Sequence, residues 1–236
     1  VVIHRQDVDV FKRGDQLEDH YLAEVAKACL RGPEAGPIAA VAARRVNRSV
    51  AANETSEFDH GSLLQTLLSI QPMAVLDALF TSDGPQESVR AEVFNELSDH
   101  RMNSIDVISY KTLIEWCNRD QETRYPLAAS IVTLACRPEE NGPRVWSEQA
   151  RAILANAPDP RSVLSVFIER FFRMGWAGSR AAQLESHARL LEDLPSEISA
   201  ESLPFIVEAR KELAKAVARE WQSETEQDRA RDERFE

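Results

Sequence analysis

The first pair of residues that could hold a metal ion is His20 and Glu24. They stand four residues apart in a stretch with helical periodicity, so both side chains would lie on one face of a helix. Two ligands do not complete a metal site, and an ordinary acidic helix surface explains the same pair. We therefore predict that the chain has no metal site and no cofactor.

The sequence also lacks the motifs of several common enzyme classes. A phosphate-binding loop needs closely spaced glycines, and the sequence contains no Gly-X-Gly, Gly-Lys-Ser or Gly-Lys-Thr. No HExxH zinc motif and no Gly-X-Ser-X-Gly nucleophile turn occurs. Helical metal phosphohydrolases use His-Asp, whereas this sequence has only Asp-His, at 19–20, 59–60 and 99–100. We predict that this segment is not an enzyme, with a helical hydrolase as the third of three functional hypotheses.

Three arginines gather on the polar side of one predicted helix, at Arg44, Arg45 and Arg48. Such a group could bind phosphates of a nucleic acid. A solvated helix face explains the same residues, because most helices of an acidic helical protein carry some arginine. This group is the second, weaker candidate binding patch.

The stronger candidate is the segment RFFRMGWAGSR at 170–180, which places Arg170, Arg173, Trp176 and Arg180 around a glycine-containing loop. Arginine and tryptophan are the residue types that most often dominate binding energy at protein interfaces, and loops often carry contact residues. The alternative is that Trp176 fills a gap between two helical layers and has no partner outside the chain.

The three cysteines are Cys29, Cys117 and Cys136, and each lies in an apolar stretch with helical character. No Cys-X-X-Cys pair is present. Buried free thiols are typical of a reducing compartment, so we predict unpaired cysteines and a cytoplasmic location.

Composition limits the remaining functional classes. The chain has 236 residues, 43% of them hydrophobic, and a net charge of −11. A dedicated nucleic-acid binder normally carries a basic face, so this charge favours another kind of partner. The sequence has no apolar run of the roughly 20 residues that cross a membrane. It begins with Val1, and we expect it to be part of a longer protein.

Two predicted helical hairpins share one apolar pattern. Counted from Pro72, the apolar positions +3, +4, +7 and +8 hold Val75, Leu76, Leu79 and Phe80, and the same offsets from Pro160 hold Val163, Leu164, Phe167 and Ile168. Each pattern predicts a short helix that must bury this face against neighbouring helices.

The rest of the chain continues this pattern, and we predict an all-α fold of about ten helices with no strand. We divide it into an N-terminal arm at 1–14, a helical-repeat domain at 15–221 and a charged C-terminal tail at 222–236. The expected helices are 15–31, 37–51, 62–71, 72–80, 86–99, 110–119, 126–136, 147–156, 160–174, 180–194 and 204–221.

Prolines that begin helices occur at 37, 72, 126, 160 and 204, with gaps of 35, 54, 34 and 44 residues. Three of these gaps fall in the range of helical repeats, so residues 37–221 resemble an irregular HEAT- or armadillo-like α-solenoid. In addition, residues 63–236 resemble the C-terminal helical region of long bacterial multidomain proteins, some of which carry an ATPase domain and act in phage defence. This resemblance implies a region of a larger bacterial protein.

The predicted function is non-catalytic protein–protein interaction, as a scaffold or sensor region. The partner would be another protein or another domain of a longer parent chain. Nucleic-acid binding through the arginine patches is the main alternative, and no membrane partner is expected.

Overall fold

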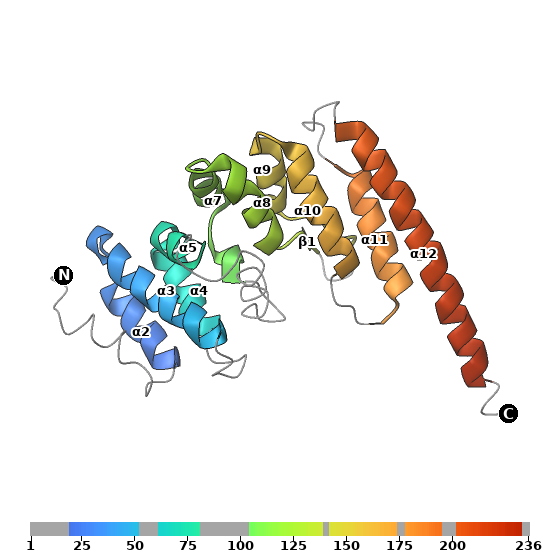
Figure 1. Ribbon diagram of the computed structural model, residues 1–236. Coiled ribbons are helices and arrows are strands. Elements are labelled where there is room, and N and C mark those ends of the chain that lie inside the picture. The colour runs from blue at the N-terminus through green and yellow to red at the C-terminus, as the bar shows by residue number, and fades with distance from the viewer. Residues whose placement is uncertain are drawn as a thin grey trace. The chain divides into compact units, whose positions relative to one another are not determined.

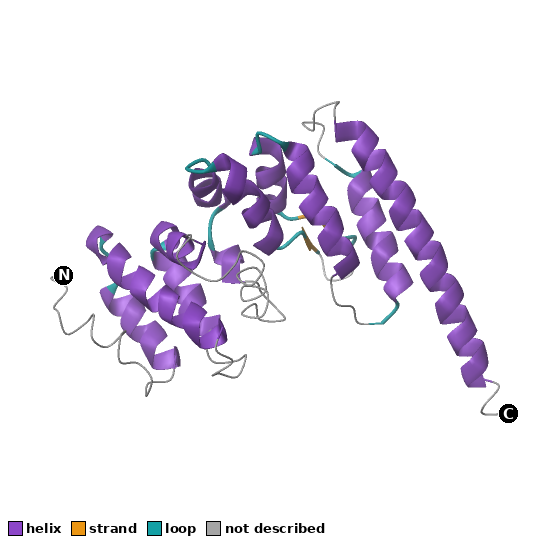
Figure 2. Cartoon of the chain, viewed as in Figure 1, coloured by secondary structure: helices purple, strands orange, loops and turns teal. Residues whose placement is uncertain are grey.

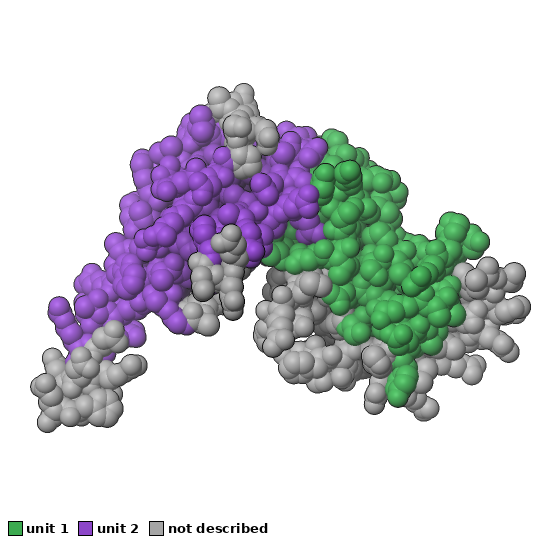
Figure 3. Space-filling model, turned by 180° about the vertical axis from the view of Figure 1, so that it is seen from behind, with its two compact units in different colours: residues 1–133 green, residues 134–236 purple. Residues whose placement is uncertain are grey.

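The computed structural model describes residues 19–51, 61–80, 104–138, 142–173, 178–194 and 202–232. Within these ranges the chain is all-α, with ten α-helices, two short 3₁₀ helices and one pair of two-residue strands (Figure 1, Figure 2). The chain divides into two compact units, residues 1–133 and residues 134–236 (Figure 3). No helix among the described residues is long and apolar enough to cross a membrane.

Unit 1 contains six α-helices and two 3₁₀ helices in its described part. They are α2 (Asp19–Cys29), η2 (Pro33–Ala35), α3 (Gly36–Ala51), α4 (Gly61–Ile70), α5 (Pro72–Phe80), η3 (Ser104–Val107), α7 (Tyr110–Cys117) and α8 (Gln121–Ile131). Helix α2 packs against α4, and α3 packs against α5, so the helices of one pair lie on those of the next (Figure 1). Further along, α5 contacts α7, which pairs with α8.

The turns of the two stacked pairs are joined by one side chain. Gln71, between α4 and α5, donates from Nε2 to the carbonyl oxygens of Leu30 and Gly32, both at 2.8 Å.

At Gly36 the backbones of α3 and α5 come close, because a Cβ placed there would lie 3.4 Å from the Cβ of Ala74. A small residue at each position therefore permits the close packing of α3 on α5.

Unit 2 begins with the strand pair β1 (Ala135–Cys136) and β2 (Val145–Trp146), which is antiparallel with Ala135 opposite Trp146. Four helices follow: α9 (Glu148–Asn156), α10 (Pro160–Arg173), α11 (Arg180–Glu192) and α12 (Leu203–Asp232). Each helix packs against the next one in the chain.

The core of unit 2 is built around Trp146. This indole is buried and donates from Nε1 to the carbonyl oxygen of Leu190 at 2.7 Å. Its ring lies 5.5 Å from that of Phe167 and 5.8 Å from that of Phe171. The ring of His187 stacks on Phe171 at 4.4 Å. Aromatic rings from β2, α10 and α11 therefore meet in one cluster.

The two matched apolar patterns are helical, as the sequence predicts. Val75, Leu76, Leu79 and Phe80 are all buried in α5. In α10, Val163, Leu164 and Phe167 are fully buried, while Ile168 is half-buried and Phe171 is the next buried residue.

Three helices begin directly after a serine that caps them. Ser109, Ser147 and Ser179 each accept a hydrogen bond from the backbone N–H three residues later. Such caps satisfy N–H groups that have no partner within the helix.

Three local predictions are wrong. The helix expected to begin at Pro126 begins instead at Gln121, and Pro126 lies inside it. The reason is that the Asp120 side chain caps this helix by accepting a hydrogen bond from the Thr123 N–H. We also expected no strand and placed Cys136 in a helix. Both expectations are wrong, because Cys136 lies in the strand β1 and is exposed. The predicted helix at 86–99 and the arm at 1–14 lie outside the described residues.

Candidate interaction surfaces

An open hollow lies between α3 and α5 of unit 1. Its volume is about 320 Å³, and its lining residues are Gly36, Pro37, Ala40 and Arg44 from α3 and Ala74, Asp77 and Ala78 from α5. The floor is thus made of small or apolar residues, because α3 and α5 approach closely where these residues face each other. One cationic and one anionic side chain are the only charged groups of this lining.

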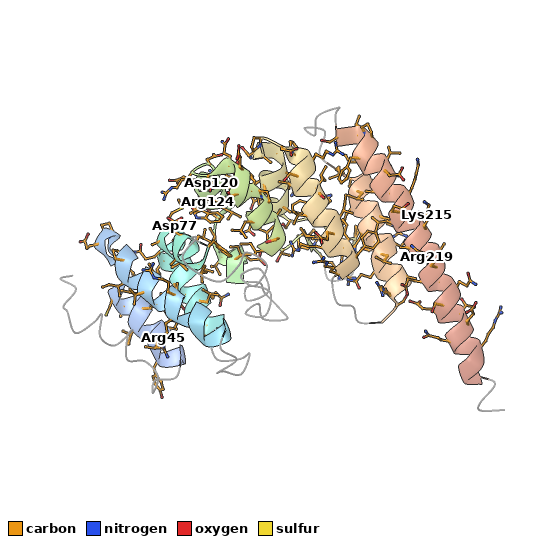
Figure 4. The ribbon with its side chains drawn as sticks, in the orientation of Figure 1. Arg45, Asp77, Asp120, Arg124, Lys215 and Arg219 are labelled. Atoms are coloured by element: carbon orange, nitrogen blue, oxygen red, sulfur yellow. The ribbon has the colours of Figure 1, made fainter. Side chains whose placement is uncertain are left out.

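The carboxylate of Asp77 is already occupied by groups of its own unit. Its Oδ1 accepts from Trp116 Nε1 at 2.9 Å and lies 3.0 Å from Arg124 Nη2, while Oδ2 lies 3.7 Å from Arg119 Nη1. Arg124 also stacks over the Trp116 ring at 4.7 Å and donates to the Trp116 carbonyl oxygen at 3.1 Å. This Asp77 cluster therefore joins α5, α7 and α8 (Figure 4).

Arg44 differs from Asp77 in having no partner among the described residues. Its side chain is exposed at the edge of the hollow, and no ion pair or hydrogen bond links it to that part of the chain. A guanidinium that keeps its five donors accessible beside an apolar floor can bind a carboxylate of another molecule.

The three arginines of the predicted second patch do not act as one group. Arg44 lines the hollow, whereas Arg45 is half-buried and makes interactions within the protein. Figure 4 shows Arg45 well apart from Asp77 and Arg124. The side chain of Arg48 lies outside the described residues.

The segment 170–180 is described only at its two ends, and Trp176 lies outside the described residues. Arg170 is half-buried at the end of α10, and burial lowers the pKa of its guanidinium to about 10, so it stays charged at neutral pH. Arg173 is exposed and pairs with Glu169 of its own helix at 2.6 Å. Whether these residues form a contact site with Trp176 stays a prediction.

Arg180 takes part in the junction between α11 and α12. Its Nε lies 3.5 Å from Oε1 of Glu220. One turn further along α12, Glu224 accepts from the Ser179 hydroxyl at 2.7 Å and from the Ala181 N–H at 3.1 Å. These two hydrogen bonds, the first the larger, lower the pKa of the Glu224 carboxyl. A carboxylate at a helix N-terminus is stabilised by the unpaired N–H groups there.

The charged tail predicted at 222–236 therefore has a contact with the helical core at its beginning. Helix α12 continues to Asp232, beyond the predicted end of the helical domain at residue 221. Apart from Glu224, the side chains described between 222 and 229 are exposed.

Two buried titratable groups of the described residues, Cys117 and His187, are uncharged at neutral pH. Burial raises the pKa of the Cys117 thiol to about 12, and the charge of Arg124 offsets only part of this effect. Burial, with the nearby charge of Arg144, lowers the pKa of His187 to about 4. At neutral pH Cys117 is a protonated thiol and His187 a neutral ring, so neither is activated as a nucleophile or a cation.

Within the described ranges, no three side chains of histidine, cysteine, aspartate or glutamate gather as metal ligands would. The His20 side chain, half of the metal pair considered above, lies outside those ranges. The described cysteines are all free, with Cys117 buried, Cys29 half-buried and Cys136 exposed.

Sequence reasoning missed two features of unit 1. The Asp77 cluster joins residues far apart in the chain, since Trp116 and Asp77 are separated by 39 positions. The hollow arises from small residues on two helices that pair only in the fold. A signal was present in the run of alanines beside Arg44, but only the packing of α3 on α5 shows which side of the helix remains open.

No known protein family, curated protein or solved structure matches this chain.

Proposed function

We propose that this chain is a non-catalytic protein–protein interaction region, and that the hollow between α3 and α5 binds a short segment of a partner protein. The observation that carries the proposal is the exposed, unpaired Arg44 beside an apolar floor in the described part of unit 1. We further propose that the chain serves as a scaffold or sensor region of a larger bacterial cytoplasmic protein, as its sequence resemblance implies.

The packing of unit 1 supports an irregular HEAT-like repeat. In an α-solenoid, successive helical hairpins stack so that equivalent helices contact each other. The contacts of α2 with α4 and of α3 with α5 follow this arrangement, and Gln71 joins the two turns. The grooves between stacked helices are the surfaces that such repeats use for binding.

The lining of the hollow defines the chemistry of the partner segment. Pro37, Ala40, Ala74 and Ala78 offer an apolar surface, which favours an aliphatic or aromatic side chain. Arg44 favours a carboxylate nearby. Asp77 adds little attraction for a cation, because Trp116 and Arg124 already occupy it. We therefore expect a segment with an apolar residue next to an aspartate or glutamate.

Nucleic-acid binding is the alternative, and two observations weigh against it. A duplex is bound by several cationic groups along its phosphates, whereas Arg44 is the single cation in the lining of the hollow. The chain as a whole carries a net charge of −11.

The test is a selection of peptides from a random displayed library against the whole chain, followed by fluorescence anisotropy. We expect the selected peptides to combine an apolar residue with an acidic one. Arg44→Glu should weaken their binding by at least about tenfold, the effect of losing roughly 1.4 kcal/mol. A matched control is Arg137→Glu, which makes the same charge change at an exposed arginine of unit 2 and should leave the affinity unchanged.

Equal binding by wild type and Arg44→Glu would contradict the assignment of the hollow. A salt-dependent complex with duplex DNA that Arg44→Glu weakens, without any selected peptide, would favour the nucleic-acid alternative.

A further inference from the structure

Helix α12 has more apolar surface than its own unit covers. It has 30 residues, against 13 in α11, the helix on which it packs. The buried side of α12 carries Ile206, Ala209, Leu213 and Ala216. These residues recur every three or four positions, which is the spacing of one helix face.

A second apolar line runs beside this buried face. Leu203 is 55% exposed, Val207 is 50% exposed and Trp221 is 45% exposed, and these three side chains account for most of the large exposed hydrophobic residues in the described chain. Val217 is half-buried and Ala214 exposed along the same line. We call Leu203, Val207, Arg210, Ala214, Val217 and Trp221 the outer stripe.

The outer stripe has the spacing of a two-helix seam. Its positions follow one another in steps of 4, 3, 4, 3 and 4 residues, which is the alternation that keeps a line of side chains facing one partner helix. At 1.5 Å per residue, the stripe extends about 27 Å along α12. A partner that covers all of it must therefore be another long helix.

The stripe is also symmetric about residue 212. Leu203 and Trp221 lie nine residues on either side of it, Val207 and Val217 five, and Arg210 and Ala214 two. A two-fold rotation therefore places each residue of the outer stripe opposite its counterpart from the second copy, as the interface of a symmetric dimer requires. We propose that α12 of a second copy of this chain covers the outer stripe in antiparallel orientation.

The antiparallel arrangement also accommodates Arg210, the one charged residue of the outer stripe. In a parallel pair Arg210 would face the same arginine of the other copy, and the like charges would repel. In the antiparallel pair it lies beside Ala214, whose small side chain leaves room for the arginine stem. The Arg210 guanidinium already reaches out of the stripe to Glu192 of α11, at 2.6 Å.

The net charge of α12 is close to zero, so two copies of this helix do not repel each other strongly, although the whole chain is acidic. Leu203–Asp232 contains six basic and seven acidic residues, a net charge of −1, against −11 for the 236 residues. Along the helix, Glu208 pairs with Lys211 at 3.3 Å and Glu212 with Lys215 at 2.6 Å. Helical geometry places Lys215 and Arg219, which are labelled in Figure 4, on the polar side of α12, away from the outer stripe.

A single seam of this length is small for a protein interface, and its apolar anchors stand mainly at its two ends. We therefore expect a weak dimer with Kd on the order of 1–100 μM. This inference is independent of the proposed function, since the hollow that binds the partner segment belongs to unit 1.

The test is sedimentation equilibrium of the whole chain from about 1 μM to several hundred μM, a range set by the expected Kd. Wild type should pass from monomer to dimer over this range. Trp221→Glu and, separately, Val207→Glu should weaken the dimer by at least tenfold while circular dichroism shows unchanged helical content. Gln222→Glu adds the same charge next to Trp221 but off the stripe, and should leave the dimer intact.

Orientation is tested by cross-linking in a background with Cys29→Ser and Cys136→Ser. A mixture of chains carrying Leu203→Cys and chains carrying Trp221→Cys should form the mixed disulfide, and neither variant alone should cross-link efficiently. A chain that stays monomeric, a dimer that both stripe variants leave unchanged, or cross-linking of Leu203→Cys with itself would each overturn the proposal.

Discussion

The two units begin from similar helical hairpins but pack them differently. In unit 1, α2 lies on α4 and α3 lies on α5, so the helices of one hairpin contact those of the next, in addition to contacts between neighbours such as α4 and α5. In unit 2, α9, α10, α11 and α12 each contact the following helix. The same offsets from Pro72 and Pro160 therefore predict buried side chains at every position except Ile168, which is half-buried, while the helix that covers them depends on the rest of the fold.

The cores differ in composition as well. The helices of unit 1 that stack on each other bury mainly leucine and alanine, including Leu63, Leu64, Leu67 and Leu68 of α4. Unit 2 gathers Trp146, Phe167, Phe171 and His187 in one aromatic cluster. The small alanine side chains of α3 and α5 permit a close approach of the two helices and leave the hollow beside them unfilled. In unit 2, aromatic rings lie between the helices instead.

The largest expected effect compares the same offset in the two units. Phe167→Ala should lower the free energy of unfolding by about 3–5 kcal/mol, because it empties a fully buried site and removes a ring contact with Trp146. Leu79→Ala, the matched position in α5, should cost about 2–4 kcal/mol. Chemical denaturation monitored by circular dichroism measures both. A smaller loss for Phe167→Ala than for Leu79→Ala would contradict the role given to the aromatic cluster.

The buried histidine makes unit 2 sensitive to acid. The folded pKa of His187 is about 4, below its ordinary value of 6.5. Between these values the unfolded chain binds more protons, so stability is complete above pH 6.5 and falls as the pH is lowered toward 4. The loss should be on the order of 3 kcal/mol.

Replacing the imidazole is the control for this effect. In His187→Leu, the free energy of unfolding measured between pH 6.5 and pH 4 should vary less than in wild type. Identical pH profiles for the two proteins would show that His187 does not carry the acid sensitivity.

In unit 1 the corresponding polar contact is the Asp77 cluster. Asp77→Ala should cost roughly 1–2 kcal/mol, because the Trp116 N–H and the largely buried Arg124 lose their shared acceptor. Asp77→Asn should lose less, since the amide oxygen still accepts from Trp116. Thermal melts of both variants test this order. Equal losses would mean that the contribution of Asp77 depends on its charge and that a neutral acceptor for Trp116 contributes nothing.

The smallest effect concerns the contact of α12 with the start of α11. Glu224→Ala removes the acceptor for the Ser179 hydroxyl and the Ala181 N–H, and should lower the melting temperature by a few degrees at most. Glu226→Ala, at an exposed position two residues later, is the matched control and should leave it unchanged. Truncation after Ser223 should resemble Glu224→Ala. A much larger loss on truncation would mean that the tail contributes further packing.

Local features were predictable from the sequence because they depend on residues close together in the chain. The caps at Ser109, Ser147 and Ser179 and the apolar offsets in α5 and α10 belong to this class. The start of α8 was also encoded locally, but the proline at 126 was a more conspicuous signal than the aspartate cap at 120.

Features made by tertiary packing were not predictable in the same way. The arginines 44 and 45 are neighbours in sequence, yet only Arg44 lines the hollow, because successive side chains on a helix point about 100° apart. The Asp77 cluster joins three helices. The exposure of Leu203, Val207 and Trp221 depends on which side of α12 packs against α11.

Hydrogen exchange of the whole chain, with and without a selected acidic and apolar peptide, tests the proposed binding function most directly. If the peptide binds between α3 and α5, amide protection should increase in Gly36–Ala51 and Pro72–Phe80 and remain unchanged in Pro160–Arg173, which lies in unit 2. Arg44→Glu should abolish this increase at the same peptide concentration. Protection that appears mainly in α10 and α11, next to the segment at 170–180, would contradict the assignment of the binding surface to unit 1.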